Sequence, residues 1–248
     1  MIPQLEICAA DIHSVHAASI GGAQRVELCS GLAEGGMTPS VGFVAQALKV
    51  PGLRVHVLIR PRPGDFLYSE EETELMCHDI RLMRQTGAHG VVIGALTANG
   101  DIDTALCSRL ISEAGDMSVT FHRAFDLTRE PLEALEQIID LKCNRVLTSG
   151  CAPSALDGAK MLATLQKQAQ ERLTILAGGG VSPQNAAEII EKSGVHELHA
   201  SARSPLASDM RYKNQGVAMG AAGTDEYSRL TTDSAIVNQI VRAIHANS

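Results

Sequence analysis

The sequence predicts a closed barrel of eight parallel strands, each followed by a helix, the (β/α)8 or TIM-barrel architecture. Short runs rich in β-branched and apolar residues recur along the whole chain, and amphipathic stretches separate them. The repeating units average about 30 residues, and a chain of 248 residues has the length of one such barrel. An open doubly wound sheet is the alternative, but eight evenly repeated units favour closure. We therefore expect one domain over residues 1–248.

Each expected strand is a short run in which apolar and β-branched residues dominate. In chain order these runs are Leu5–Cys8, Arg25–Cys29, Arg54–Arg60, Gly90–Gly94, Ser118–His122, Arg145–Ser149, Thr174–Ala177 and Glu197–Ser201.

The stretches between these runs repeat apolar residues at intervals of three and four, which predicts helices. Proline is expected in the first turn of several helices, and glycine at the end of others. The prolines are Pro39, Pro131, Pro153 and Pro183, and the glycines are Gly22, Gly87, Gly115 and Gly194. A stretch rich in glycine and alanine, Gly216–Thr224, predicts a long loop before a last helix near Asp233–His245.

Composition excludes several function classes. The net charge is -7, aromatic residues make up 3% and Trp is absent, which argues against nucleic-acid binding and against an anionic membrane surface. The start of the chain has no signal-peptide pattern, and no apolar run approaches the ~18 residues of a membrane span. We expect a cytoplasmic protein whose six cysteines are reduced, and no CxxC pair is present.

Strand periodicity directs unusual polar residues into the barrel. With a side-chain period of two, Glu6, Cys8, Glu27 and Cys29 face inward near the carboxyl ends of the first two strands. Because neighbouring strands lie about 4.8 Å apart, the two thiols can approach one another. The same parity turns inward His56, Leu58 and Arg60, then Thr120 and His122, and finally Glu197, His199 and Ser201.

Buried carboxylates need cationic partners, so Glu6 and Glu27 are expected to pair with Arg60, Arg62, Arg123 or a protonated histidine. One interpretation of this group is structural, as a charge network that closes the barrel floor. The other is a site at the barrel mouth, where active sites of this fold lie.

Several residues of the mouth suit the chemistry of a small anionic substrate. Arginine recognises carboxylate or phosphate with two parallel hydrogen bonds. His122 is a candidate general acid or base, or a satisfied core histidine. His122, Arg123 and Asp126 are expected within hydrogen-bonding range of one another. The candidate catalytic residues are Glu6, Glu27, Arg60, His122, Arg123 and Asp126.

Gly178, Gly179 and Gly180 follow the seventh strand, and Ser201 and Arg203 follow the eighth. Glycine-rich turns at these two places form the common phosphate site of this fold, because their backbone N–H groups can approach an anion. The alternative is a tight turn that needs positive φ angles.

The cysteines divide by position. Cys77, Cys107 and Cys143 fall on predicted helices or helix ends and are expected in the core. Cys151 lies in a loop and stays undecided. Cys8 and Cys29 each follow an inward glutamate by two residues, and two thiolates without a close third ligand suit Cu(I) better than Zn or Mg. The lysines all lie away from strand ends, which argues against a Schiff-base aldolase.

The motifs together resemble the copper homeostasis protein CutC family, whose fold is a TIM barrel. The matching segments are Glu6–Cys8, Gly22–Cys29, Glu34–Ser40, Arg60–Arg62 with Gly64–Phe66, Phe121–Asp126, Arg145–Gly150, Gly178–Gly180 and Arg211–Asn214. The resemblance implies a cytoplasmic homo-oligomer that handles copper, with Cu(I) bound by Cys8 and Cys29. Pro63 departs from the family, which commonly has glycine there.

Two hypotheses follow. In the first, Cys8 and Cys29 bind Cu(I) at the barrel mouth, with nearby Met or His as further ligands. In the second, the chain is an enzyme for a small anionic or phosphorylated metabolite. The glycine turn and Ser201 with Arg203 would then hold the anion, and the arginines would orient the substrate.

Overall fold

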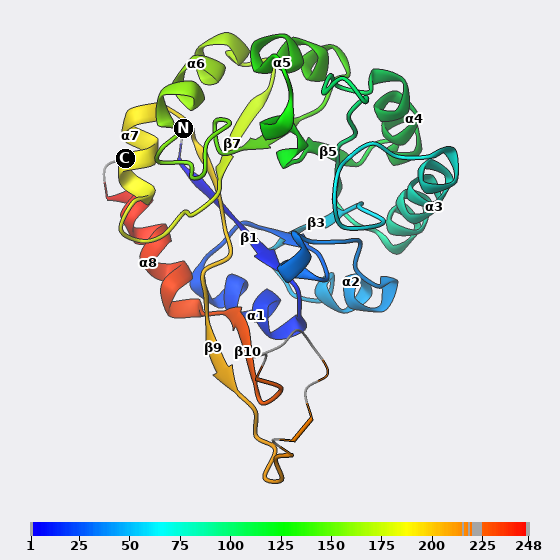
Figure 1. Ribbon diagram of the computed structural model, residues 1–248. Helices are drawn as coiled ribbons and strands as arrows, with labels where there is room; N and C mark the ends of the chain where they lie inside the picture. The colour runs from blue at the N-terminus through cyan, green and yellow to red at the C-terminus, as the bar shows by residue number, and fades with distance from the viewer. Residues whose placement is uncertain (1, 215, 218, 220–224, 247–248) are drawn as a thin grey trace.

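A computed structural model describes residues 2–214, 216–217, 219 and 225–246. Eight parallel strands close into a barrel in the order β1 to β8, with β8 pairing β1 (Figure 1). The predicted (β/α)8 barrel is therefore confirmed, and each predicted strand overlaps an observed one. The strands are β1 Gln4–Ala9, β2 Arg25–Leu28, β3 Arg54–Leu58, β4 Gly90–Ile93, β5 Ser118–Phe121, β6 Arg145–Thr148, β7 Thr174–Gly178 and β8 Glu197–Ala200.

In the part of the chain that the structure describes, eight α-helices surround the strands (Figure 1), and two short 3-10 helices, η1 and η2, follow β2 and β5. The α-helices are α1 Ile12–Gly21, α2 Val41–Ala47, α3 Glu70–Thr86, α4 Thr104–Ala114, α5 Pro131–Asp140, α6 Ala159–Ala169, α7 Ala186–Ser193 and α8 Ser234–His245; the 3-10 helices are η1 Leu32–Glu34 and η2 Arg123–Leu127.

The predicted helix ends agree with the structure better than the predicted helix starts do. All four predicted glycines stand directly after a helix and have positive φ angles, which glycine adopts at little cost. Pro131 begins α5 as predicted. Pro39, Pro153 and Pro183 instead lie in the loops before α2, α6 and α7, so the prediction that they occupy first turns was wrong.

The barrel wall separates two sets of buried side chains. Leu5, Ile7, Val26 and Leu28 belong to the large apolar layer between strands and helices. A second, small cluster consists of Cys8, Cys29, Leu58 and Val92, which face inward from β1, from the residue after β2, from β3 and from β4. The predicted parity of β1, β2 and β3 is therefore confirmed, and polar inward residues share the barrel interior with this cluster.

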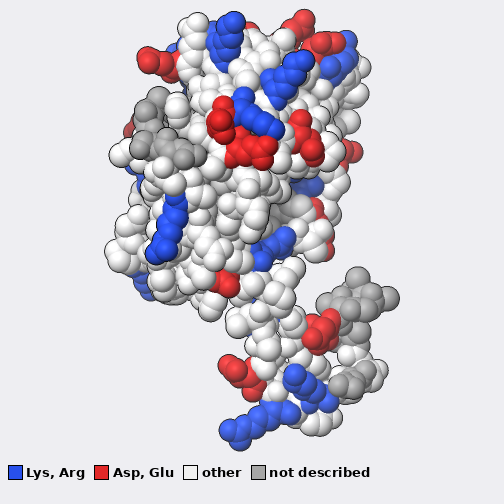
Figure 2. All heavy atoms as spheres, turned by 90° about the vertical axis from the view of Figure 1, so that its left-hand side faces the viewer, with Lys and Arg blue, Asp and Glu red and all other residues white. Residues whose placement is uncertain are grey.

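An antiparallel ribbon of β9 (Arg203–Ala207) and β10 (Ser228–Thr232) was not predicted. It projects from the barrel in Figures 1 and 2, with exposed Arg211 and Lys213 beyond β9, and Figure 2 shows Lys and Arg side chains at its end. At its base, the Thr231 hydroxyl lies 3.0 Å from the Ser14 hydroxyl of α1. Most of the predicted loop 216–224 lies outside the described residues. None of the described helices is long and apolar enough to cross a membrane.

Candidate functional site

Two thiols meet inside the barrel. Cys8 is the inward residue near the end of β1, and Cys29 directly follows β2. Their Sγ atoms lie 3.5 Å apart without a disulfide bond, and both residues are buried. Leu58 and Val92 pack against them. The expectation that the two thiols can approach one another is therefore confirmed.

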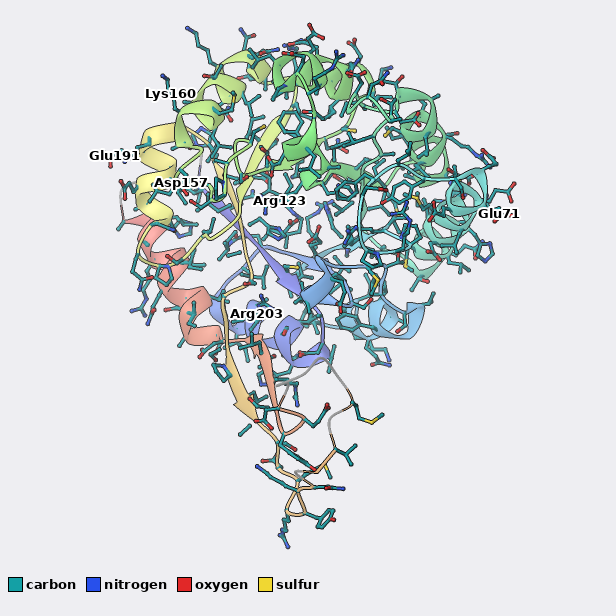
Figure 3. The ribbon with its side chains drawn as sticks, viewed as in Figure 1. Glu71, Arg123, Asp157, Lys160, Glu191 and Arg203 are labelled. Atoms are coloured by element: carbon teal, nitrogen blue, oxygen red, sulfur yellow. The ribbon has the colours of Figure 1, made fainter. Side chains whose placement is uncertain are left out.

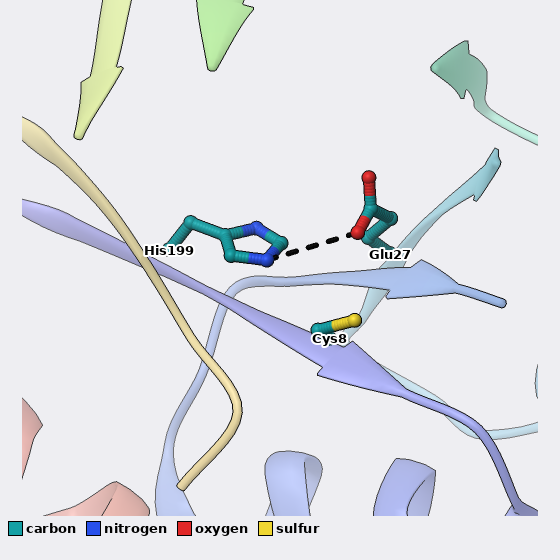
Figure 4. A group of neighbouring side chains, drawn as sticks. All are labelled: Cys8, Glu27 and His199. Atoms are coloured by element: carbon teal, nitrogen blue, oxygen red, sulfur yellow. Dashed lines mark ion pairs between the residues drawn. The ribbon is translucent and has the colours of Figure 1, made fainter. Parts of the chain in front are cut away.

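A carboxylate and an imidazole complete this group, which we call the thiol group: Cys8, Cys29, Glu27 and His199. One ligand atom each from Cys8, Glu27 and His199 lie within 4.8 Å of one another (Figure 4). His199 Nε2 is 3.7 Å from Glu27 Oε2. The thiols therefore have close third donors, and the expectation of a pair without one was wrong. The sequence signal was the inward parity of His199, on the strand that closes the barrel against β1.

The thiol group is short of positive charge. The pKa of the Cys8 thiol is raised well above its ordinary value by the Cys29 thiol, by burial and by the nearby Glu27 carboxylate. Burial also raises the pKa of Glu27, and the nearby His199 offsets this rise only in part. Both groups therefore hold their protons more strongly than they would in water, as expected where negative charge is poorly compensated.

Below the thiol group, four charged residues form the floor network: Glu6, Arg25, Arg145 and Glu197. Arg25 pairs with Glu6 and lies 2.5 Å from Glu197 Oε2, and Arg145 Nε lies 2.9 Å from that same oxygen. Arg25, Arg145 and Glu197 are the first residues of their strands, so this network lies toward the amino-terminal end of the barrel. This geometry supports the structural interpretation for Glu6.

The predicted cationic partners of Glu6 and Glu27 were right in part. His199 is the histidine partner that the prediction allowed, whereas Arg25 takes the place expected for Arg60, Arg62 or Arg123. Arg25 has the inward parity of Glu27, and it stands opposite Glu6 in the parallel register of β1 and β2. Parity alone could not show this pairing, because the stagger of the barrel decides which inward residues share a level.

His199 connects the two groups. Its Nδ1 lies 2.7 Å from Glu6 Oε1, so the Glu6 carboxylate orients the imidazole with Nε2 toward Glu27. Burial lowers the pKa of His199, but Glu6 and Glu27 outweigh burial and raise that pKa above its ordinary value. Burial likewise raises the pKa of Glu6, but Arg25 and then His199 hold it below its ordinary range.

Arg60 and Arg62 hold loops. Arg60 is buried and donates from Nη1 to the carbonyls of Glu34 and Gly36, at 2.9 and 2.7 Å, and from Nη2 to the carbonyl of Gly64 at 2.9 Å. It thereby joins the segments that follow β2 and β3. Arg62 lies nearer the surface and pairs with Glu72 at 2.6 Å.

His122 directly follows β5 and is a neutral, buried imidazole. Its Nδ1 accepts a hydrogen bond of 3.1 Å from the Ala124 N–H, so its proton is on Nε2. Burial, followed by the charge of Arg60, lowers the pKa of His122 to about 3. It makes no hydrogen bond with Arg123 or Asp126 among the described residues, contrary to the expectation that the three lie within reach of one another.

Arg123 and Asp126 form a clamp on the end of β6. Asp126 accepts from the Ser149 N–H at 3.1 Å and from the Cys151 N–H at 3.2 Å, and it also accepts from the Thr148 hydroxyl. Arg123 Nε donates to Asp126 at 2.7 Å, and Nη2 donates to the Ser149 hydroxyl at 2.9 Å. The guanidinium is thus held in one orientation while it stays partly exposed, and Figure 3 shows it inside the ring of helices.

The glycine turn lies beside this clamp. Gly179 and Gly180 have φ angles of +104° and +71°, and a Cβ on Gly179 would lie 3.5 Å from Arg123 Nη1. Among the described residues, the N–H groups of these two glycines have no hydrogen-bond acceptor. Gly178 is buried at the end of β7.

Ser201 and Arg203 have other surroundings. The Ser201 carbonyl accepts from the Thr232 hydroxyl of β10 at 3.1 Å, which ties the end of β8 to the ribbon. Arg203 is exposed at the base of the ribbon, apart from Arg123 in Figure 3. The structure therefore brings Arg123, which sequence reasoning assigned to the substrate, to the glycine turn.

The remaining cysteines fall into two kinds. Cys77, Cys107 and Cys143 are buried in the apolar layer, as predicted. Cys151 is exposed in the loop after β6, with a φ angle of 57°. Burial of its sulfur, followed by the charge of Asp126, raises the pKa of Cys151 to about 11.

The fold and site define a class: a (β/α)8 barrel with thiol, carboxylate and imidazole groups inside it and an arginine clamp at its mouth. A sequence model of the CutC family matches residues 3–204. The chain belongs to the CutC family.

Three relatives illustrate this membership. The chain is 52% identical over 240 residues to a CutC family protein of Chromobacterium violaceum, covering 97% of each chain. It is 50% identical over 240 residues to one of Bacteroides thetaiotaomicron, covering 96% of each. It also resembles a crystal structure named for a copper homeostasis protein CutC of Streptococcus agalactiae, with 31% identity and a TM-score of 0.78 over 81% of this chain and 99% of that one.

Proposed function

We propose that this chain serves copper homeostasis by binding Cu(I) at Cys8 and Cys29. The observation that carries the proposal is the separation of 3.5 Å between two unbridged, buried Sγ atoms. Metal–thiolate bonds are about 2.3 Å long, so one ion can contact both sulfurs at this separation. The name of the Streptococcus agalactiae relative, which assigns that protein to copper homeostasis, agrees with the proposal.

His199 is the best third donor. Cu(I) is a soft ion that prefers sulfur and imidazole over carboxylate, which favours His199 over Glu27. Glu6 contacts the Nδ1 atom of His199, so Nε2 is the nitrogen that can bind the ion. Metal-binding histidines are commonly oriented in this way by a carboxylate on the other ring nitrogen. Both cysteines bind a metal as thiolates, so Cu(I) displaces the thiol protons when it binds.

Anaerobic titration of the reduced protein with Cu(I), against a competing chelator, tests the proposal. We expect one ion per chain, and loss of this binding in both Cys8→Ser and Cys29→Ser. Cys77→Ser, at a buried cysteine of α3, and Cys151→Ser, at an exposed cysteine, are the matched controls and should bind as the parent does. Undiminished binding in the first two variants would exclude the site.

We propose a cytoplasmic location as well, because binding of Cu(I) at Cys8 and Cys29 needs reduced thiols, and thiols stay reduced in the cytoplasm.

We also propose a homo-oligomer, because the ribbon segment exposes large apolar side chains. Met210, Tyr212 and Leu230 are 59%, 76% and 56% exposed. Light scattering on the size-fractionated protein, with Leu230→Ser as the variant, measures the assembly; a monomeric parent would contradict this proposal.

A second candidate function is favoured by the orientation of Arg123. We propose that the barrel mouth binds a small anionic metabolite, held by Arg123 together with the free N–H groups of Gly179 and Gly180. Glu27, whose pKa burial raises, is the candidate acid or base of an enzyme reaction. The floor network engages Glu6, so its contribution is to orient His199.

Binding of inorganic phosphate, followed by thermal unfolding and by titration, tests the second candidate. Arg123→Gln should remove the stabilisation. Arg203→Gln is the control, because it removes an exposed arginine at the base of the ribbon. Failure of phosphate to bind would remove this function, whatever the result with copper.

A further inference from the structure

Unpartnered polar atoms gather on one side of the barrel interior. Five buried side-chain nitrogen or oxygen atoms of the described residues have no hydrogen-bond partner, and four of them belong to β3, β5 and the residues just after these strands. Native proteins rarely leave such atoms unpaired, so a concentration of them indicates a missing partner. The four are His56 Nδ1, Arg60 Nε, Thr120 Oγ1 and His122 Nε2.

Arg60 also lacks a counter-ion in the described part of the chain, where it forms no ion pair. Its side chain is buried among uncharged groups: its hydrogen bonds go to three carbonyls, and the Tyr68 hydroxyl, the fifth unpaired atom, lies beside it. A buried charge without a partner is expensive. The missing partner of Nε is therefore expected to be negatively charged.

Arg60 and His122 lie on the same side of the mouth. Both contact the ring of Phe66: Arg60 Cζ is 5.1 Å from the ring centroid, and the His122 ring is 4.8 Å from it, centre to centre. Gly94, which follows β4 between them, has no side chain, and a Cβ there would lie 2.5 Å from His122 Cε1. The missing side chain of Gly94 makes room for the imidazole, whose Nε2–H is a donor.

We propose that Arg60 Nε and His122 Nε2 bind the carboxylate of a small molecule at the barrel mouth. A charged donor beside a neutral donor suits a carboxylate, which accepts at both oxygens. The inference rests on the second candidate function and names its substrate class: a small carboxylic acid whose second anionic group is held by Arg123 and Gly179. His122 then acts as a fixed hydrogen-bond donor rather than as an acid or base.

Three small probes separate the two halves of this site. 3-Phosphoglycerate carries a carboxylate and a phosphate, glycerol 3-phosphate lacks the carboxylate, and glycerate lacks the phosphate. Titrated into the reduced, metal-free protein, 3-phosphoglycerate should bind at least about tenfold more tightly than glycerol 3-phosphate, since each hydrogen bond to a charged group contributes that much or more. In His122→Phe the preference for 3-phosphoglycerate over glycerol 3-phosphate should shrink but persist, because Arg60 still donates to the carboxylate, while Arg123→Gln should weaken both.

A second measurement avoids dependence on the folding of a variant. In parent protein labelled with 15N-histidine, 3-phosphoglycerate and glycerate should shift the Nε2–H resonance of His122, and glycerol 3-phosphate should not. Equal affinity for the two phosphates with an unmoved His122 resonance overturns the carboxylate site and leaves the phosphate function standing. No binding of any phosphate, with a His122 shift by glycerate alone, removes the phosphate function and keeps this site. No effect of any probe overturns both, and ordered water is then the partner of these atoms.

Discussion

His199 Nδ1 lies 2.7 Å from Glu6 Oε1, which joins the ion-paired floor of the barrel to its thiol group. Glu6 is held in turn by Arg25, so the imidazole is oriented by a residue that is itself anchored. The other ring nitrogen faces Glu27 at 3.7 Å. A charge network built for structure thus determines which way a candidate metal ligand points.

Glu6→Gln should weaken Cu(I) binding without changing its stoichiometry. The amide keeps the shape of the carboxylate but removes the charge that orients His199, and loss of such an outer partner typically lowers metal affinity about 10- to 100-fold. The chelator competition described above measures it. Glu136→Gln, which disturbs an exposed pair with Arg172, is the control. An unchanged affinity in Glu6→Gln would show that His199 is not a ligand.

Glu197→Gln should destabilise the fold while leaving copper stoichiometry intact. Its Oε2 accepts from both Arg25 and Arg145, and breaking a buried ion pair on one side leaves uncompensated charge, at a cost of about 3–5 kcal/mol. Urea unfolding followed by circular dichroism gives the free energy of unfolding. Glu136→Gln should cost less than about 1 kcal/mol, because its pair is solvated. Similar losses in the two variants would contradict the role of the floor network.

Stability should fall as the pH drops below 6.5, because two buried histidines resist protonation. Burial lowers the pKa of His56 to about 3, and burial followed by Arg60 does the same for His122. The unfolded chain takes up protons near pH 6.5 and the folded one does not, so between pH 6.5 and about 3 each imidazole costs about 1.4 kcal/mol per pH unit. Urea unfolding between pH 6.5 and 5 measures this slope. His122→Gln should roughly halve the part of this slope that His56 and His122 contribute. A slope unchanged from the parent would show that His122 titrates in the folded protein as it does in the unfolded chain.

Much of the barrel is readable from the sequence, because strand composition and terminal glycines repeat in every unit. Gly22 and Gly87 end helices where only glycine adopts the required φ angle cheaply. The ribbon was missed because β9 contains Pro205, which weakens the signal of a strand and is tolerated here at a sheet edge.

Only part of the candidate site could be predicted from the sequence. A period of two along each strand placed Glu6, Cys8 and His199 inside the barrel, because parity is a local property. Which inward residues meet depends on barrel stagger and on closure between β8 and β1, which no local pattern encodes. The sequence therefore identified both thiols but missed Arg25 as the partner of Glu6, and it assigned Arg123 to carboxylates that the structure places elsewhere.

Gly94→Ala tests a close approach that sequence reasoning did not single out. Gly94 has no positive φ angle, so alanine is permitted by its backbone. The new Cβ would nevertheless lie 2.5 Å from His122 Cε1 and 2.6 Å from Nδ1. The ring cannot move freely, since Nδ1 accepts from the Ala124 N–H and Phe66 contacts the ring. We expect a loss of about 1–3 kcal/mol in the free energy of unfolding, the usual cost of an overpacked site.

Gly42→Ala is the matched control, because a Cβ at that position in α2 would have no heavy atom within 4 Å. It should stabilise the protein by about 0.5–1 kcal/mol, the ordinary gain of alanine over glycine within a helix. The double variant Gly94→Ala/His122→Ala isolates the cause: if the ring is what the new methyl meets, the two losses will be clearly less than additive. If the losses in the free energy of unfolding are additive, the new methyl group does not clash with the His122 ring. The absence of a side chain at Gly94 would then not determine how His122 directs its Nε2–H toward a carboxylate.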